Sequence, residues 1–335
     1  MAANEIAPTA WWRRFGVAVV RWFDTSAADA AADTREGIDW ARVVPFIGMH
    51  VMCLGVIFVG FSWFALWVAL ALYVVRMFAI TGFYHRYFSH KAFKTSRAAQ
   101  FFFGFVGASC VQRGPLWWAA HHRNHHRHSD TQADPHSPLH RGFFWSHMGW
   151  FLTREGFRTD ENVIRDLTKF PELKLLDRFD ILVPIALATG LFFLGGWLET
   201  AYPALGTSAA QLLIWGFFVS TVVLFHATVT INSFAHKFGR RRFDTGDDSR
   251  NNWLLALITF GEGWHNNHHH FPGAARQGFR WWEYDFTYYL LRVLAVFRIV
   301  WDLKPVPAEL VKSGAVRVAV TAREQADPAD RKRAA

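Results

Sequence analysis

The stretch VVPFIGMHVMCLGVIFVGFSWFALWVALALYVV, residues 43 to 75, contains no Asp, Glu, Lys or Arg. It is much longer than the roughly 20 apolar residues that cross a bilayer once. Gly60, Phe61 and Ser62 divide it, and a glycine close to a serine is typical of a turn. The stretch therefore predicts two membrane-spanning helices in a hairpin, over residues 43–60 and 62–80.

A second apolar stretch, from Ile181 to Ala235, carries Glu199 as its only charged residue. Residues 198–208 divide this stretch, because they contain a proline and a glycine beside the glutamate. Two further spans are predicted, over residues 181–197 and 209–231. The expected fold class is an all-α membrane protein with four transmembrane helices in two hairpins. A soluble protein with two buried helical hairpins is the alternative.

The basic residues are distributed in a way that orients these spans. All 36 Lys and Arg lie in residues 1–42, 76–178 and 237–335, and neither predicted turn within a hairpin contains one. By the positive-inside rule these three regions face the cytoplasm, as an even number of spans permits. The net charge of +9 suits anionic lipid or an acidic ligand. No nucleic-acid partner is expected, because the sequence contains no nucleic-acid-binding motif.

The same pattern divides the chain into three segments. Residues 1–42 are expected to be an N-terminal cytoplasmic or interfacial segment, residues 43–311 the membrane domain, and residues 312–335 a basic, disordered tail. Residues 98–111 are apolar but too short to cross a bilayer, so a buried or membrane-grazing helix is expected there. Residues 280–303 alternate charged and aromatic side chains at helical spacing, which predicts a helix along the interface.

Histidines are concentrated in a few short motifs. The motif WWAAHHRNHHRH, residues 117–128, places three histidines at i, i+3 and i+4, which share one face of a helix and can reach one metal or two adjacent metals. The motif WHNNHHH, residues 264–270, repeats this spacing. HRYFSH, residues 85–90, places two histidines five apart, about 140° apart on an ideal helix, so they converge only if the helix ends or distorts there. His236 follows the fourth predicted span.

These motifs together predict a two-metal site in a helical cap on the cytoplasmic side. Nine histidines are too many for one metal and suit two metals with four or five nitrogen ligands each. Imidazole suits Fe, Cu, Ni and Zn, and no CxxC pair offers a thiolate site. A histidine-lined transporter is an alternative, but it predicts ligands inside the spans, where only His50 and His226 lie. The nine candidate ligands are His85, His90, His122, His125, His126, His236, His265, His268 and His269.

The chain resembles the integral-membrane fatty-acid desaturases of the stearoyl-CoA (delta-9) type, with features of bacterial members. The matching motifs are HRYFSH (85–90), HHRNHH (121–126), DPHSP (134–138), RGFFWSHMGW (141–150), NSFAH (232–236), GEGWHNNHHHFP (261–272) and WWEYD (281–285). The resemblance implies a four-span, mushroom-shaped fold and a dinuclear iron centre with O2 as co-substrate. It also implies that the nine histidines are the ligands, that Asn232 reaches one iron through water, and that no catalytic residue is needed beyond the ligands.

The resemblance further implies a cis double bond in a saturated acyl chain, and that Trp118, Gln112 and Arg154 contact the substrate. Acyl-CoA is the expected carrier. A membrane lipid or an acyl carrier protein is the alternative, because Ala120 and the Arg154–Glu155 pair depart from the animal pattern that holds CoA. A membrane hydroxylase with the same iron site is the rival activity. Glu262 is expected to orient a ligand histidine.

No haem-binding HPGG segment and no rubredoxin-type CxxC pair occur in the sequence. A separate electron donor is therefore expected: ferredoxin, rubredoxin or cytochrome b5, with its reductase. The expected location is the bacterial inner membrane, with the active site on the cytoplasmic side.

Overall fold

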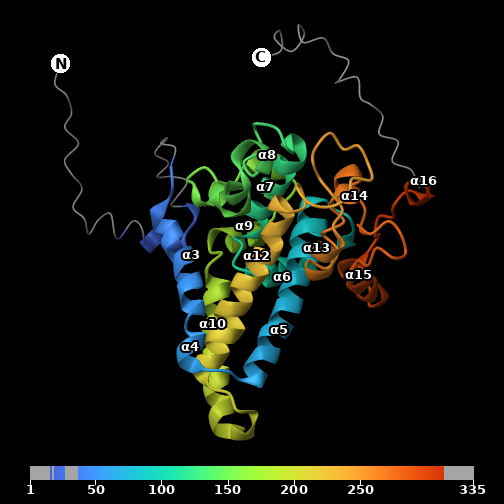
Figure 1. Ribbon diagram of the computed structural model, residues 1–335. Helices are drawn as coiled ribbons and strands as arrows, with labels where there is room; N and C mark the ends of the chain where they lie inside the picture. The colour runs from blue at the N-terminus through green and yellow to red at the C-terminus, as the bar shows by residue number, and fades with distance from the viewer. Residues whose placement is uncertain (1–15, 17–18, 27–36, 313–335) are drawn as a thin grey trace, which may run out of the picture.

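The computed structural model describes residues 16, 19–26 and 37–312, and within them the chain is mainly helical (Figure 1). The predicted tail, except for Lys312, and most of the predicted N-terminal segment lie outside the described residues. The elements that carry the argument below are α3 (Trp40–Cys53), α4 (Val56–Val59), α5 (Trp63–Phe78), η1 (Ala79–Ser89), α6 (Arg97–Ala108), α7 (Pro115–His128), α9 (Pro171–Arg178), α10 (Leu182–Ala201), α11 (Ala209–Gln211), η6 (Leu212–Val219), α12 (Ser220–Ser233), α13 (Trp253–Ile258), α14 (His265–His270) and α15 (Phe286–Val296).

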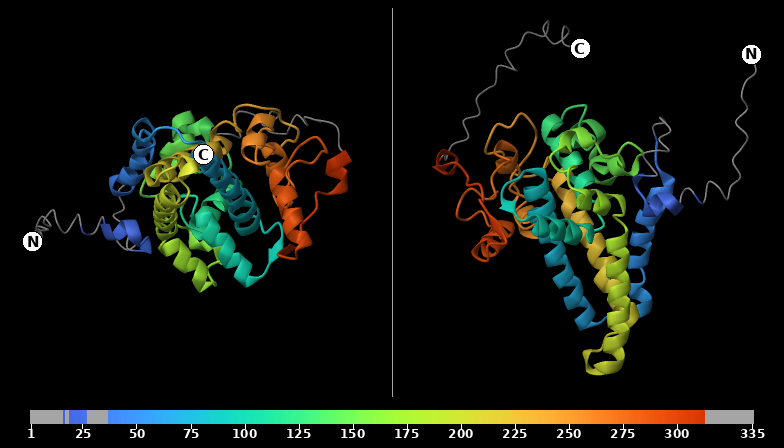
Figure 2. Two further views of the ribbon diagram at one scale, coloured as in Figure 1. Left: turned by 90° about the horizontal axis from the view of Figure 1, so that it is seen from below. Right: turned by 180° about the vertical axis from the view of Figure 1, so that it is seen from behind.

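Among the described residues, four stretches of helix are long and apolar enough to cross a membrane: Arg42–Val59, Trp63–Ser89, Leu182–Ala201 and Ala209–Ser233. They extend from one end of a broad cap and narrow toward their far ends, as both side views show (Figures 1 and 2). The predicted all-α membrane fold with four spanning helices is confirmed. Ser62 begins the second span, because its hydroxyl accepts a hydrogen bond from the Ala65 N–H over 3.3 Å.

Two of the spans change their helical winding. The second span runs as the α-helix α5 and then as the π-helix η1. The fourth begins with the short α-helix α11, continues as the π-helix η6 and ends as α12. A π-helix has hydrogen bonds from residue i to i+5, and such segments are frequent at functional sites. The winding of η1 sets the directions of the side chains at the cap end of the second span.

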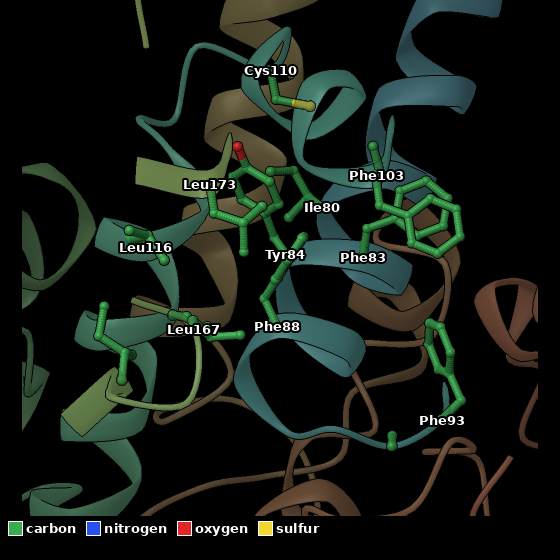
Figure 3. Packing of buried hydrophobic residues seen from close by; sticks show 14 of the residues in the cluster. Ile80, Phe83, Tyr84, Phe88, Phe93, Phe103, Cys110, Leu116, Leu167 and Leu173 are labelled. Atoms are coloured by element: carbon green, nitrogen blue, oxygen red, sulfur yellow. The ribbon is translucent and has the colours of Figure 1, made fainter. Parts of the chain in front are cut away.

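The cap packs on η1 through a buried aromatic core (Figure 3). The rings of Phe83 and Phe103 stack with their centroids 3.8 Å apart. Tyr84 is fully buried, and its hydroxyl donates to the carbonyl oxygens of Gly104 and Arg113. The predicted short helix over 98–111 corresponds to α6, which contributes Phe103 to this core and does not cross the membrane. The cap is therefore anchored directly on the end of the second span.

The C-terminal part wraps around the cap beside the second span (Figure 2). The expectation of a helix over residues 280–303 is wrong at both ends. The helix α15 begins only after Asp285, whose carboxylate accepts from the Tyr288 N–H over 2.9 Å. Beyond α15, strand β2 (Val300–Trp301) pairs antiparallel with β1 (Lys94–Thr95), which ties this end of the chain to the segment before α6.

Candidate metal centre

Five histidines from distant parts of the chain converge at the cap end of the spans. We call them the five-histidine group: His85, His90, His122, His126 and His268. One ring nitrogen of each lies within 4.8 Å of those of the others. His85 and His90 converge because the chain keeps the π-helical winding: the His90 N–H donates to the His85 carbonyl oxygen over 3.2 Å, a bond from i to i+5.

Four further histidines form a second group beside the first. We call them the four-histidine group: His125, His236, His265 and His269. The His126 and His269 rings, one from each group, have centroids only 4.5 Å apart. Helix α7 contributes to both groups, since His122 and His126 enter the first and His125 the second. The structure therefore brings all nine candidate ligands together, divided five and four.

The distances between ring nitrogens fit metal coordination. The Nε2 atoms of His85 and His268 are 3.0 Å apart, and those of His236 and His265 are also 3.0 Å apart. Two ligands at right angles on a metal with bonds of about 2.1 Å would stand about 3 Å apart. Within the described residues, the buried Nε2 of His269 has no hydrogen-bond partner. Two ring nitrogens this close share either a proton or a metal ion. Five and four such nitrogens gathered together form donor sets that fit a bound metal.

Carboxylates accept hydrogen bonds from the outer nitrogens of four of these rings. The pairs are His85 Nδ1 with Glu262, His125 Nδ1 with Asp134 (3.1 Å), His236 Nδ1 with Asp130 (2.7 Å) and His269 Nδ1 with Asp247 (2.7 Å). A ring that donates from Nδ1 keeps its Nε2 lone pair for a metal, and such partners fix the ring orientation. Glu262 thus contacts a candidate ligand, as its position next to the motif WHNNHHH (264–270) suggested. The three aspartates were not predicted from the sequence. The motif DPHSP contains Asp134 and the run DTGDD (244–248) contains Asp247, whereas Asp130 lies in neither.

Burial sets the charge of these groups. It lowers the pKa well below the ordinary value in five rings: His90, His122, His126, His265 and His268. Burial also lowers the pKa of His269 to about 4, although its hydrogen bond to Asp247 opposes this. Burial raises the pKa of Asp247, but the hydrogen bond and charge of His269 outweigh it and hold that pKa below its ordinary range. The six rings whose pKa is lowered are therefore neutral near pH 7, which is the form that binds metal. His125 differs: burial lowers its pKa, but the charge and hydrogen bond of Asp134 outweigh burial and raise it.

A buried guanidinium fixes Glu262 against His85. Arg86 is buried and donates from Nη2 to Glu262 Oε1 over 3.0 Å and from Nη1 to Asp285 Oδ2 over 3.0 Å. Gln277 Nε2 donates to Glu262 Oε2 over 2.9 Å. Both carboxylate oxygens are therefore held, and the side chain has little freedom to leave the histidine.

An apolar cavity of about 490 Å³ leads from the spans to the histidines. Helices α3, α10 and α12 supply much of its wall, and three of its rings, Phe46, Phe151 and Phe225, contact one another edge to face. His122 lines the cavity, as does Asn232, which the resemblance assigned to one metal through water. The five-histidine group therefore borders, through His122, a space suited to an apolar ligand.

The three predicted substrate contacts lie in different places. Trp118 lines the cavity and stacks on the His122 ring with centroids 5.1 Å apart. Gln112 also lines it and donates from Nε2 to Thr228 Oγ1 over 3.0 Å. Arg154 is exposed and is not among the described residues that line the cavity.

The two histidines inside the spans have their own partners. His50 Nε2 lies 3.1 Å from His226 Nε2, and His226 Nδ1 lies 3.0 Å from His147 Nε2. His147 Nδ1 in turn lies 2.9 Å from Ser233 Oγ. This chain of hydrogen bonds connects α3 to α12 and the cap. It is separate from both metal groups, which gather at the cap end, and this placement disfavours an ion path along the spans.

Comparison with known proteins gives concordant matches. The family model described as fatty acid desaturase matches residues 61–300. The chain is 37% identical over 277 residues to the sn-1 stearoyl-lipid 9-desaturase of Anabaena variabilis, covering 82% of this chain and 97% of the relative. It is 37% identical over 294 residues to an acyl-CoA 5-desaturase of Anemone leveillei, covering 84% and 86%. It is also 37% identical over 281 residues to a chloroplastic palmitoyl-monogalactosyldiacylglycerol delta-7 desaturase of Arabidopsis thaliana, covering 83% and 71%.

Proposed function

Since the chain belongs to the fatty acid desaturase family, we propose that it introduces a cis double bond at the ninth carbon of a saturated acyl chain. The reaction converts –CH2–CH2– to –CH=CH– and reduces O2 to two molecules of water, which consumes two electrons and two protons besides the two hydrogens of the substrate. The observation that carries the proposal is the pair of adjacent histidine groups, one of which borders an apolar cavity through His122. The ninth-carbon assignment is supported by the motifs and by a relative named for that position.

The two groups are proposed to hold one iron each. All nine histidines serve as ligands, and Asn232 completes the four-histidine group through a water molecule. Nine imidazole nitrogens with no thiolate suit iron, and iron with O2 supplies the oxidising chemistry that an unactivated methylene requires. Glu262 and the three aspartates hold the rings so that Nε2 faces the metal.

The cavity performs the positioning. A methylene chain offers no hydrogen-bonding group, so only the shape of an apolar wall can present one pair of carbons to the metals. Trp118 stacks on a ligand ring, and Gln112 bonds to Thr228 on α12, so the two bound the inner part of the cavity. Arg154, on the exposed surface, is proposed to meet the polar carrier. The apolar lining also keeps bulk water from the reacting carbons.

The partners follow from this assignment. The protein spans the bacterial inner membrane with its cap in the cytoplasm, as the distribution of Lys and Arg indicates. A separate ferredoxin, rubredoxin or cytochrome b5, with its reductase, supplies the electrons. Acyl-CoA is the carrier expected from the resemblance. Relatives named for acyl-CoA and for acyl lipids are equally similar to this chain, so the residues at the mouth of the cavity bear on the choice.

The test is the fatty-acid profile of bacterial cells that express the chain, with double bonds located by mass spectrometry of derivatised esters. His125→Ala and His268→Ala remove one candidate ligand from each group, and His128→Ala, at an exposed position of the same helix α7, is the matched control. New cis-monoenes at one position, present with the control and absent from both ligand variants, are expected. Hydroxylated products would instead establish the rival oxygenase. Absence of any product from cells supplied with reductase and donor, with no iron in the purified chain, would overturn the proposal.

A further inference from the structure

The mouth of the acyl cavity contains a buried cation with unused hydrogen-bond donors. Arg42, at the start of α3, lines the cavity and is only 9% exposed. Its Nε and Nη2 atoms are buried and have no hydrogen-bond partner among the described residues. Its guanidinium lies over the Phe157 ring, 4.9 Å from the centroid. A buried guanidinium whose donors lack acceptors is unfavourable, so a ligand that supplies the missing oxygen atoms is expected here.

The other cations near Arg42 already have partners. A smaller cavity of about 140 Å³ adjoins the first, shares Arg42 and Arg113 with it, and is also lined by Arg21. Arg113 Nε donates to Asp180 over 2.6 Å, and Arg21 Nη2 donates to Asp39 over 2.6 Å. Three guanidinium groups and two carboxylates leave a net charge of +1. Arg42 supplies the unbalanced charge and the free donors.

One unbalanced charge suits one phosphate diester. Coenzyme A carries three phosphate groups, and these would require several free cations close together. A membrane phospholipid carries a single phosphate diester a few bonds from its acyl esters. With the phosphate beside Arg42, an acyl chain of the same molecule can extend into the cavity toward His122. The number of free donors therefore favours a phospholipid over CoA.

The cavity also reaches the surface that the bilayer covers. Ile185 and Thr189, on the membrane-spanning helix α10, both line the cavity and are exposed on the outside of the protein, Ile185 by 41%. Pro45 on α3 and Pro184 on α10 line both cavities, so the two cavities meet between these helices. A chain can therefore enter sideways from the membrane between α3 and α10, without leaving the lipid phase.

We propose that this protein takes its acyl chain from a membrane phospholipid, which enters between α3 and α10 and is held by its phosphate at Arg42. The assignment rests on the proposed function and names its substrate class. Arg42 is a binding residue for the head group and takes no part in the chemistry at the metals.

The first test measures binding, which needs neither metal nor electron donor. Trp117, Trp118 and Trp150 line the cavity, so a phospholipid with a dibrominated acyl chain quenches their fluorescence when it occupies the cavity. Trp63, Trp67 and Trp197 are exposed on the spans and are replaced by phenylalanine in every protein compared, so that lipid outside the cavity does not quench them. Arg42→Gln is expected to weaken this quenching by about tenfold in apparent affinity, the loss of one charge-assisted contact. Arg97→Gln, which removes a charge paired with Glu172 on the exposed surface, is the matched control and is expected to behave as wild type. Equal quenching in all three proteins would overturn the site.

The second test measures turnover in vesicles with electron donor and reductase. The substrates are distearoyl phosphatidylglycerol, distearoylglycerol, which lacks the phosphate, and stearoyl-CoA. Wild type is expected to desaturate the phospholipid, and Arg42→Gln to raise its KM about tenfold with kcat and iron content unchanged, while turnover of distearoylglycerol does not change. Desaturation of stearoyl-CoA alone would overturn the phospholipid proposal and leave the desaturase intact. Desaturation of none of the three would count against the proposed function, and the binding result would still decide the Arg42 site.

Discussion

Two Asp→Asn substitutions around the four-histidine group are predicted to have unequal effects, although each removes one carboxylate charge beside a candidate ligand. Asp247 accepts from the Ser249 N–H through Oδ1 (3.0 Å) and from His269 Nδ1 through Oδ2 (2.7 Å). The backbone donor is fixed, so in Asp247→Asn the amide oxygen must stay at Oδ1 and the NH2 group must face His269. The ring then presents Nδ1 as acceptor and carries its proton on Nε2, which can no longer bind metal.

Asp130 is arranged differently. Its Oδ2 accepts both from His236 Nδ1 (2.7 Å) and from the Asp248 N–H (2.8 Å), and its Oδ1 accepts only from the Ser137 hydroxyl (2.9 Å). In Asp130→Asn the amide oxygen can therefore keep both nitrogen donors, while the NH2 group donates to Ser137, whose hydroxyl can also accept. His236 keeps its tautomer and its Nε2 lone pair.

The magnitudes follow from these two arrangements. Loss of a partner that orients a ligand typically lowers metal affinity by about 10- to 100-fold, or about 1.4 to 2.8 kcal/mol. Asp247→Asn is expected to lower metal affinity by about 100-fold or more, since it also removes a ligand nitrogen. Asp130→Asn is expected to lower it by about 10-fold or less. Iron retained against a competing chelator measures this in purified protein, with melting temperatures of the metal-free variants as the control for folding. Equal losses in the two variants, or a larger loss in Asp130→Asn, would refute the reasoning from tautomers.

Three further predictions concern stability. Gly107→Ala should lower the free energy of unfolding by about 1–3 kcal/mol, because a Cβ at this position would lie 2.0 Å from Tyr84 Cε1 in the core. Gly48→Ala is the control and should leave the stability unchanged, because a Cβ at Gly48 would have no atom within 4 Å. Melting temperatures in detergent compare the two variants. Burial raises the pKa of Asp177 from 3.8 to about 7, against the backbone N–H groups at the start of α7 that donate to it. Folding therefore favours the protonated form of Asp177. The resulting contribution to the free energy of unfolding, about 4 kcal/mol, is present below pH 4 and is lost as the pH rises through 7. The melting temperature of wild type should fall relative to that of Asp177→Asn over this pH range, and parallel curves for the two proteins would contradict the prediction. Removal of metal by a chelator should lower the melting temperature of wild type and have little effect on His125→Ala/His268→Ala, since a ligand of the folded state stabilises it by mass action.

Much of the fold could be predicted because its signals are local. Two long apolar runs, the first without charge and the second with Glu199 alone, are sufficient to predict four spans. The first predicted turn agrees with the structure, whereas α10 continues to Ala201, into the second predicted turn. The cap follows from the position of the basic residues. The ends of α15 could not be predicted, since aromatic and charged residues at helical spacing continue on both sides of it. Asp285 caps α15 at its start. After the end of α15, Val300 pairs with Thr95 in a strand, and this pairing depends on a residue distant in sequence.

The candidate ligands could be predicted, but their division could not. Spacing on α7 placed His122, His125 and His126 on one face, which is compatible with one metal or two. Only the tertiary arrangement shows that His125 turns toward the four-histidine group. The convergence of His85 and His90 required a distortion that spacing could not establish, and the π-helical winding supplies it.

The partners of the ligands required the folded structure as well. Asp130 and Asp247 contact histidines 106 and 22 residues away, so proximity in sequence gives no indication of these pairs. Glu262 could be suspected because it precedes the motif WHNNHHH (264–270). Its contact is nevertheless with His85, which belongs to the motif HRYFSH (85–90). Arg42 gave no sequence signal at all, because its importance comes from burial without a partner.

The central claim is that the nine histidines hold two metals, and anomalous X-ray diffraction at the iron absorption edge tests it most directly. Crystals of protein purified from iron-supplied cells are expected to show two peaks per chain, one within the five-histidine group and one within the four-histidine group. A single peak shared by both groups, or a peak at His50 and His226 within the spans, would contradict the account.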